Sequence, residues 1–212
     1  MSNAEWRSPF GRLMIFFYLI MLIYVSIMDV FPFVFSFTAG LPNSVDVVKP
    51  GIHLWPAKPL WGNYLNAWKR FAMSRLFVNT IIAASGGVLA QITVSSLAAD
   101  SLSRLNPRDL YEAAQMDGAS EIIVFTRITL PLSSSVLLVL RLFAFIGFWG
   151  EFLWPFLIPC QSELQPISVR LYTLRRGFPL NLYMAASFIA MIPPSLAAFY
   201  LQQHAPKSGL TF

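Results

Sequence analysis

Four long apolar runs dominate the chain and are separated by segments richer in polar residues and proline. They cover residues 13–37, 76–99, 132–158 and 182–202. An α-helix needs about 20 predominantly apolar residues to cross the hydrocarbon core of a bilayer, and each run is about that long. The pattern therefore predicts an all-α fold, a polytopic transmembrane helical bundle.

The first run, 13–37, is interrupted only by Asp29 and Pro32 and follows two arginines. A secretory signal peptide also begins with basic residues and an apolar stretch. Here the apolar stretch is too long for a signal peptide, and no clear small-x-small cleavage site follows it. We therefore expect a retained first span.

The polar segment 38–75 carries four prolines together with several tryptophans and tyrosines. Proline interrupts helices and aromatic rings suit the membrane interface, so residues 61–71 could form a short helix on the membrane surface. The next run, 76–99, is rich in Ala, Ser and Gly, which let helices approach closely in lipid. Because no repeat or low-complexity linker divides the chain, we expect a single membrane domain over residues 1–212.

Composition supports the membrane class. Of the 212 residues, 56% are hydrophobic and 12% are charged, whereas soluble domains have about 25% charged residues. The abundance of aromatic residues excludes disorder, the single Cys160 excludes a disulfide-stapled fold, and the continuous apolar runs fit a transmembrane β-barrel badly. The net charge of +5 contains no Lys/Arg run longer than two, so we assign it to lipid headgroups and loops rather than to nucleic acid.

The segment between the second and third runs predicts two short helices joined by a glycine turn. Asn106 is a good N-cap and Pro107 suits the first helical position, so a helix should continue to about Met116. Gly118 is then a natural left-handed stop, and Ser120 can cap a second helix. On the first helix, two small alanines beside an acid would leave a flat patch that another protein's backbone could approach closely.

The same segment contains the pattern E-A-A-x3-G-x9-I-x-L-P. It is met at Glu112, Ala113, Ala114, Gly118, Ile128, Leu130 and Pro131. This pattern resembles the EAA loop of ABC-importer permeases, the binding-protein-dependent inner-membrane component family. In that family the loop is cytoplasmic and docks into a cleft on the ATP-binding subunit, while the permease itself binds no nucleotide.

The resemblance implies a multi-pass protein of a bacterial-type cytoplasmic (inner) membrane. The residues expected to couple it to the ATPase are Glu112, Ala113, Ala114, Asp117 and Gly118. The positive-inside rule mildly opposes a cytoplasmic loop here, so the orientation rests on the motif. The implied partners are ABC ATPase subunits, a second permease subunit, an extracytoplasmic substrate-binding protein and membrane lipid.

Further segments resemble the carbohydrate (maltose-type) branch of the family. They are Asn63-Tyr64, Asn79-Thr80, the run from Trp149 to Pro155, and the four residues from Pro166 to Val169. The resemblance implies an importer of sugars or related polyols. Family members usually have six spans and four are predicted here, so a shortened, non-transporting membrane scaffold derived from such a permease is the alternative.

Candidate chemistry is sparse. Glu151 between Trp149 and Trp154 forms a plausible sugar-contacting set, and a plain interfacial aromatic belt is the alternative. The two histidines lack partners at metal-ligand spacing, and neither a P-loop nor a catalytic set is present, so we expect no metal, no cofactor and no enzyme. Asp29 and Arg141 lie inside predicted spans; they pair across helices, or Arg141 extends its side chain toward the interface.

Overall fold

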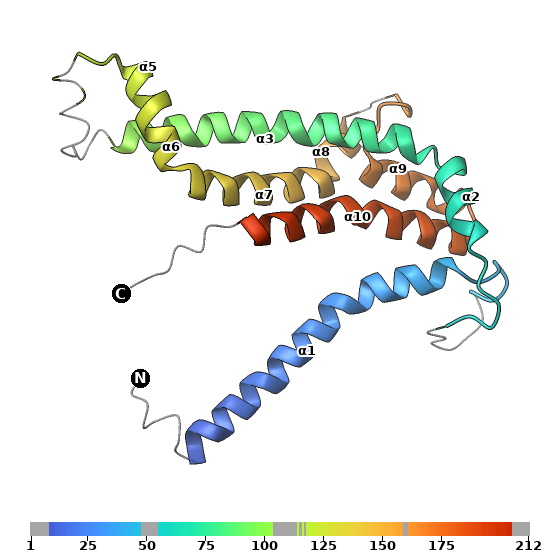
Figure 1. Ribbon diagram of the computed structural model, residues 1–212. Coiled ribbons are helices and arrows are strands. Elements are labelled where there is room, and N and C mark those ends of the chain that lie inside the picture. The colour runs from blue at the N-terminus through green and yellow to red at the C-terminus, as the bar shows by residue number, and fades with distance from the viewer. Residues whose placement is uncertain are drawn as a thin grey trace. The chain divides into compact units, whose positions relative to one another are not determined.

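The computed structural model describes residues 9–47, 55–103, 114, 116, 118–158 and 161–204. In chain order the elements are α1 (Pro9–Gly40), α2 (Gly62–Arg70), α3 (Met73–Ser103), α5 (Glu121–Val124), the π-helical turn η2 (Phe125–Thr129), α6 (Leu130–Leu132), α7 (Ser134–Gly150), α8 (Leu153–Leu157), α9 (Ile167–Leu174), the 3-10 turn η3 (Arg175–Gly177) and α10 (Leu180–His204) (Figure 1). Over these ranges the chain forms no strand, and the predicted all-α fold is confirmed.

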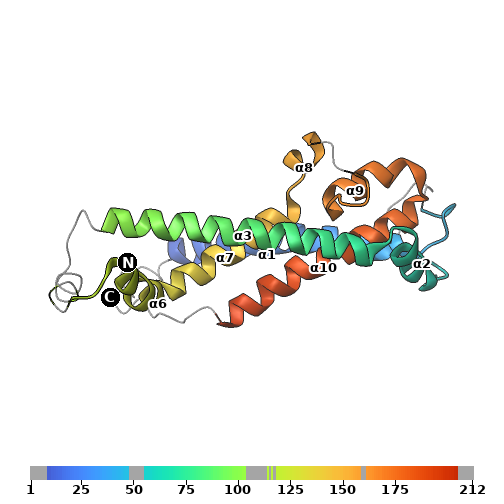
Figure 2. The same ribbon diagram turned by 90° about the horizontal axis from the view of Figure 1, so that it is seen from above.

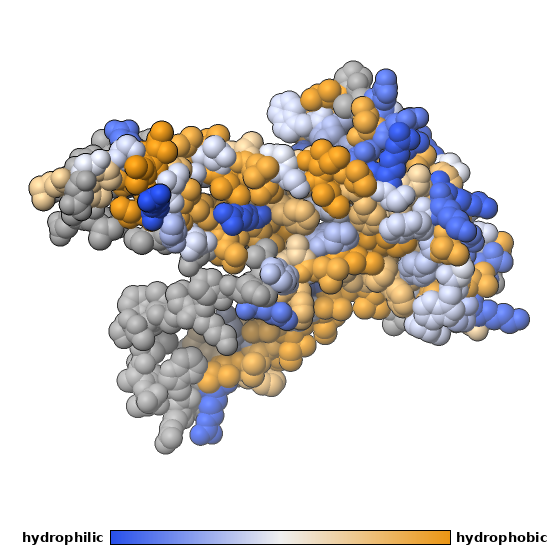
Figure 3. Space-filling view, turned by 45° about the horizontal axis from the view of Figure 1, so that its top comes forward, coloured by the Kyte–Doolittle hydropathy of each residue, from blue (hydrophilic) through white to orange (hydrophobic). Residues whose placement is uncertain are grey.

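Within the described ranges, four helical stretches are long and apolar enough to cross a membrane. These candidate spans are Arg12–Gly40, Met73–Ala99, Val136–Leu157 and Leu180–Tyr200. They differ from the predicted runs by a few residues at their ends. Apolar side chains cover much of the surface of the long helices (Figure 3). Such a surface suits contact with lipid or with a partner subunit and is unfavourable in water.

The third predicted run is one span in the sequence but two helices in the structure. Helix α7 ends at Gly150, and α8 begins at Leu153. Pro155 explains the break, because a proline removes the hydrogen bond to the carbonyl four residues before it and its ring clashes with that carbonyl, here that of Glu151. The Ser168 hydroxyl donates to this carbonyl at 2.6 Å and so replaces the lost helical bond.

The described helices belong to two compact units. The first comprises Met1–Phe71 and Arg175–Ile189, and the second Ala72–Leu174 and Ala190–Phe212. In the second unit α3 and α7 run side by side (Figures 1 and 2). Small buried side chains such as Ala84 and Ala144 let these two helices approach closely.

In the first unit, α2 holds the end of α1 through backbone carbonyls. The last carbonyls of a helix have no partner within it. The buried Asn63 amide donates to the carbonyl of Gly40, the last residue of α1, and to that of Pro42, which follows the helix, both at 2.9 Å. The Asn181 amide of α10 also donates to Pro42, at 3.1 Å. The amide groups of α2 and α10 thereby fix the point where the first span ends.

Tyr64 of α2 makes a second contact with α1. Its hydroxyl donates to the carbonyl of Phe37 at 2.6 Å. Its ring packs edge-on against Phe188 of α10, with ring centroids 6.0 Å apart. Desolvation by burial raises the pKa of Tyr64 from 10.0 to about 12.

This shift predicts a loss of stability in alkali. Because the folded pKa of Tyr64 lies above its unfolded value, the stabilisation is complete below pH 10 and is lost as pH rises from 10 through about 12. We expect thermal unfolding of the purified protein to show this decline, and Tyr64→Phe to flatten it. Identical pH dependence in the wild type and the variant would contradict this assignment.

Candidate coupling site and substrate path

The predicted coupling turn is partly described. Ala114 and Met116 are helical, and Gly118 has a φ of +77°. The Ala119 N–H donates to the Ala114 carbonyl at 3.0 Å. A bond from the second residue after the helix to its third-last residue, across a left-handed residue, is the Schellman helix stop. The prediction that Gly118 stops the helix in the left-handed region is therefore confirmed.

Three of the five coupling residues, Glu112, Ala113 and Asp117, lie outside the described residues. Gly118 is exposed, and a Cβ built on it would meet no atom within 4 Å. The turn thus requires glycine for its backbone angle and not for lack of space. ATPase contact by these five residues stays a prediction.

Two exposed apolar side chains flank the turn. Met116 is 86% exposed and Ile122 is 75% exposed. Large apolar side chains with so little contact within the chain suit a surface that another protein covers. The sequence pattern placed Met116 only at a helix end and did not indicate its exposure, because no periodicity defines a buried face in so short a helix.

A largely helical segment, interrupted only at Ser133, leads from the turn to α7. Ser120 occupies the N-cap position with an extended backbone, although its side chain makes no capping bond. From α5 the chain passes through the π-helical η2 into α6, and Ser133 separates α6 from α7. Pro131 in α6 has no N–H to donate to the preceding turn. That preceding turn, η2, is π-helical and therefore wider than an α-helical turn.

Trp149 on α7 is held by a backbone carbonyl of α10. It is 5% exposed, and its indole N–H donates to the Ala190 carbonyl at 3.1 Å. In an uninterrupted helix that carbonyl would accept from residue 194, but Pro194 has no N–H. Trp149 therefore satisfies a carbonyl that Pro194 leaves without a helical partner.

The other two residues of the predicted substrate path share a helix cap. The Glu151 carboxylate accepts from the backbone N–H groups of Leu153 at 3.0 Å and Trp154 at 3.4 Å. Trp149 thus packs inside the chain, and Glu151 caps α8. Trp154, in contrast, is 65% exposed. Sugar contact by these three residues stays a prediction.

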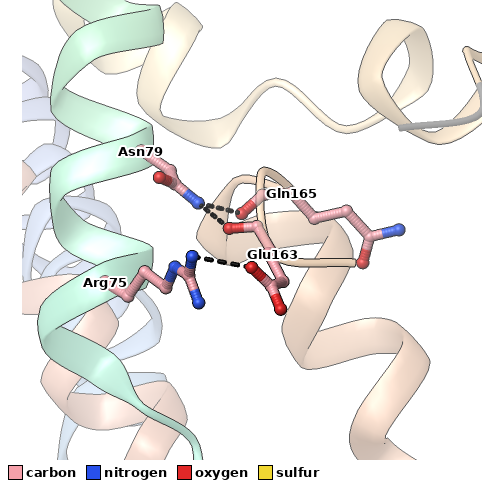
Figure 4. A network of polar contacts seen from close by, with 4 residues as sticks. All are labelled: Arg75, Asn79, Glu163 and Gln165. Atoms are coloured by element: carbon pink, nitrogen blue, oxygen red, sulfur yellow. Dashed lines mark hydrogen bonds and ion pairs between the residues drawn. The ribbon is translucent and has the colours of Figure 1, made fainter. Parts of the chain in front are cut away.

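A polar clamp fastens the segment before α9 to α3 (Figure 4). The Asn79 amide donates to the carbonyls of Glu163 at 2.7 Å and Gln165 at 3.2 Å, and Arg75 pairs with the Glu163 carboxylate at 2.7 Å. One helical turn of α3 thereby fixes a segment more than 80 residues away in sequence.

Thr80 supports the same segment from within the core. The buried Thr80 hydroxyl donates to the Leu76 carbonyl at 2.8 Å and accepts from the Ile167 N–H at 2.9 Å. The resemblance had singled out Asn79-Thr80 and the residues from Pro166 to Val169 without giving them a role. The structure shows that they contact one another.

The clamp predicts that substitutions of Arg75 and Asn79 lower the stability of the fold by different amounts. Arg75 and Glu163 have side chains 56% and 62% exposed, so Arg75→Gln should cost less than about 1 kcal/mol and nothing in high salt. Asn79→Ala removes two hydrogen bonds to backbone and should cost about 1–2 kcal/mol at any salt concentration. Thermal unfolding at low and high salt measures both. A larger, salt-dependent effect of Arg75→Gln would contradict this ranking.

One known protein family matches this chain over nearly its whole length. The family described as binding-protein-dependent transport system inner membrane component matches residues 2–207, nearly the whole chain. The chain belongs to this family. Its location is therefore the inner membrane, and the family consists of transporter permeases rather than enzymes.

Several permease proteins of transport systems are similar to about half of the chain. The trehalose/maltose transport system permease protein MalG of Thermococcus litoralis is 38% identical over 108 residues, 50% of this chain and 38% of that protein. The osmoprotective compounds uptake permease protein GgtD of Synechocystis sp. is 34% identical over 101 residues, 46% of this chain and 34% of that protein. The aligned part thus spans little more than a third of the length of these curated relatives.

A third relative and a solved structure complete the comparison. The sn-glycerol-3-phosphate transport system permease protein UgpE of Yersinia pestis is 35% identical over 101 residues, 46% of this chain and 36% of that protein. A chain of a bacterial ABC transporter involved in the import of the acidic polysaccharide alginate superposes with a TM-score of 0.59. That match covers 96% of this chain and 98% of the other at 14% identity, so it shows a shared fold.

Proposed function

We propose that the chain is a permease subunit of an ATP-driven importer and that residues 112–118 couple it to an ATPase. The observation that carries this proposal is the exposed turn at Gly118, closed by the bond from Ala119 to Ala114 and flanked by exposed Met116. A rigid stop with bare apolar side chains suits docking into a cleft of another protein. In this proposal ATP is bound by that partner, and no cofactor is expected in this chain.

The proposed cargo is a sugar or a related polyol. The printed names of the relatives describe transport of trehalose and maltose, of sn-glycerol 3-phosphate and of osmoprotective compounds. Trp154 offers an open aromatic face on which the C–H surface of a sugar ring could stack, beside the Glu151 carboxylate that caps α8. A second permease subunit and an extracytoplasmic binding protein complete the proposed assembly.

The helical path from the turn suggests how coupling operates. A displacement of Gly118 by the ATPase would pass through α5, η2 and α6 into α7, which packs along α3. The two helices then move as one packed pair, because close-packed interfaces shift between discrete arrangements rather than deform continuously. The chain alternates sides at each span, so a cytoplasmic turn places the segment between Leu157 and Leu180 on the opposite, extracytoplasmic side.

The alternative is a membrane scaffold that docks an ATPase without transporting. It is favoured by one observation: four candidate spans lie in the described ranges, against the six that the family resemblance implies. Reconstitution with cognate ATPases, second permease and binding protein decides between the two. ATP-dependent uptake of labelled maltose, trehalose or sn-glycerol 3-phosphate into proteoliposomes supports the importer, whereas assembly and ATP hydrolysis without uptake of any of the three support the scaffold.

A further inference from the structure

Gln91 and Ser95 of α3 and Arg141 of α7 place polar groups inside candidate membrane spans. None of these three side chains has a hydrogen bond or ion pair within the part of the chain that the structure describes. The neighbouring Thr93 and Ser96, by contrast, donate to carbonyls of their own helix. A charged or amide side chain without a partner is costly in hydrocarbon and normally faces a bundle interior or a water-filled path.

The three side chains lie on the faces where α3 and α7 meet. The two helices run side by side in opposite directions (Figures 1 and 2), and a Cβ added at Gly87 of α3 would lie 2.7 Å from the Phe148 ring of α7. From this contact toward the coupling turn, Gln91 and Ser95 are four and eight residues along α3, and Arg141 is seven residues back along α7. Residues four, seven or eight apart share a helix face. At 1.5 Å per residue these steps measure about 6, 12 and 10.5 Å, so the level of Arg141 falls between those of Gln91 and Ser95.

The inner polar patch, formed by Gln91, Ser95 and Arg141, lies in the half of the bilayer nearer the coupling turn. Gln91 is eight residues before Ala99, where its candidate span ends, and Arg141 is five residues after Val136, where its candidate span begins. These steps correspond to about 12 and 8 Å, within half of a hydrocarbon core of about 30 Å. Gln91 and Arg141 are exposed and Ser95 is partly exposed, so the described part of the chain leaves the patch accessible.

The chemistry of Arg141 decides which solute suits the patch. Its guanidinium is always charged and carries donors but no acceptor, so its partner is an anion such as a carboxylate or phosphate. The Gln91 amide and the Ser95 hydroxyl each donate and accept, as the hydroxyl groups of a sugar or polyol require. A neutral solute would leave the charge of Arg141 unpaired. A lipid phosphodiester offers only acceptors and would leave the Gln91 amide oxygen without a donor.

We propose that the inner polar patch binds the anionic group, a carboxylate or a phosphate, of a transported sugar or polyol. Arg141 pairs with the anionic group, while Gln91 and Ser95 form hydrogen bonds with hydroxyl groups of the same solute. This inference rests on the proposed function, and it narrows the cargo from sugars and polyols in general to those that carry a negative charge.

Protection of a cysteine beside the patch measures binding without requiring transport. In the assembled complex of permeases and ATPases, Cys160 would be replaced by serine, and Ala98→Cys introduced three residues after Ser95, at an exposed position of α3. A water-soluble thiol reagent would label this cysteine in the presence of glucuronate or glucose, and of sn-glycerol 3-phosphate or glycerol. We expect the anionic member of at least one pair to slow labelling at a concentration at least about tenfold lower than its neutral counterpart, the effect of one charged hydrogen bond.

Substitutions of Arg141 assign the selectivity to the patch. Arg141→Gln should raise the protecting concentration of the anionic probe at least about tenfold, whereas Arg141→Lys keeps the charge and should retain most of the protection. Arg70→Gln, which removes an exposed arginine of α2 outside the patch, is the matched control and should behave as the wild type does.

Four results would overturn the proposal. They are equal protection by anionic and neutral probes, unchanged protection in Arg141→Gln, an equal loss in Arg70→Gln, and no labelling of the cysteine at all. Slower labelling on addition of phosphatidylglycerol, without an effect of either anionic solute, would assign the patch to lipid and overturn it as well. The uptake assay described above tests the importer separately, because uptake of a neutral sugar without anion-selective protection would contradict this inference alone.

Discussion

Gly118→Pro is expected to abolish substrate-stimulated ATP hydrolysis and uptake in the reconstituted complex. Proline fixes φ at about −65°, whereas Gly118 has a φ of +77°. The chain would therefore leave the helix in another direction, and the Ala119 bond to the Ala114 carbonyl would be lost. The coupling turn would no longer present the same surface to the ATPase.

The same variant should insert and fold normally. A Cβ at Gly118 meets no atom within 4 Å, so no packing inside the chain is disturbed. Gly118→Asn is the matched control, because asparagine tolerates the left-handed region and should keep most of the activity. Stimulated hydrolysis at the wild-type rate in Gly118→Pro would refute the role of this turn, whereas loss of the protein from the membrane would indicate a folding role.

Gly87→Leu is expected to cause the largest loss of stability. A Cβ at Gly87 of α3 would lie 2.7 Å from ring atoms of Phe148 on α7, closer than real Cβ contacts occur. The two helices would have to separate or Phe148 would have to leave its position, and overpacking of this kind costs about 1–3 kcal/mol. Because α7 carries the proposed coupling path, uptake should fall together with the unfolding temperature.

The neighbouring glycine supplies the control. A Cβ at Gly86 would meet nothing within 4 Å, so Gly86→Leu should leave the unfolding temperature nearly unchanged. Phe148→Ala should partly rescue Gly87→Leu, because it removes the ring that the new side chain meets. Equal destabilisation by the Gly86 and Gly87 variants, without rescue, would contradict the close approach of α3 and α7 at this position.

The spans could be predicted from the sequence because bilayer thickness sets the length of an apolar run. The helix stop at Gly118 could be predicted because glycine readily adopts the left-handed backbone conformation that ends a helix. The interruption at Glu151 also has a local cause, the proline four residues later, although the length of the run concealed it.

Other features depend on partners distant in sequence. The sequence predicts Trp149 in a substrate path, yet its indole N–H donates to the Ala190 carbonyl, which Pro194 leaves without a helical partner. Only the packing of α7 on α10 shows this. Asn63 and Asn79 belong to segments that carry the family resemblance, but the carbonyls that accept their hydrogen bonds lie in segments with no pattern of their own. A cavity at the end of α1 has walls from two spans and a loop, so no local pattern could have indicated it.

The hypothesis of an Asp29–Arg141 pair stays a prediction. Asp29 is on α1 in the first unit and Arg141 on α7 in the second, and both side chains are exposed. Side chains on a helix lean toward its N-terminus, so Arg141, seven residues into α7, is well placed to extend toward the interface instead.

Cross-linking at Ala114 tests the central claim most directly. The chain's single cysteine, Cys160, would be replaced by serine, and Ala114→Cys introduced beside the turn. A short thiol cross-linker in membranes containing the cognate ATPase should capture that subunit, while Gln161→Cys, exposed on the segment before α9, should not. Failure to capture the ATPase from position 114, together with labelling of that cysteine by a membrane-impermeant reagent added outside intact cells, would contradict the account.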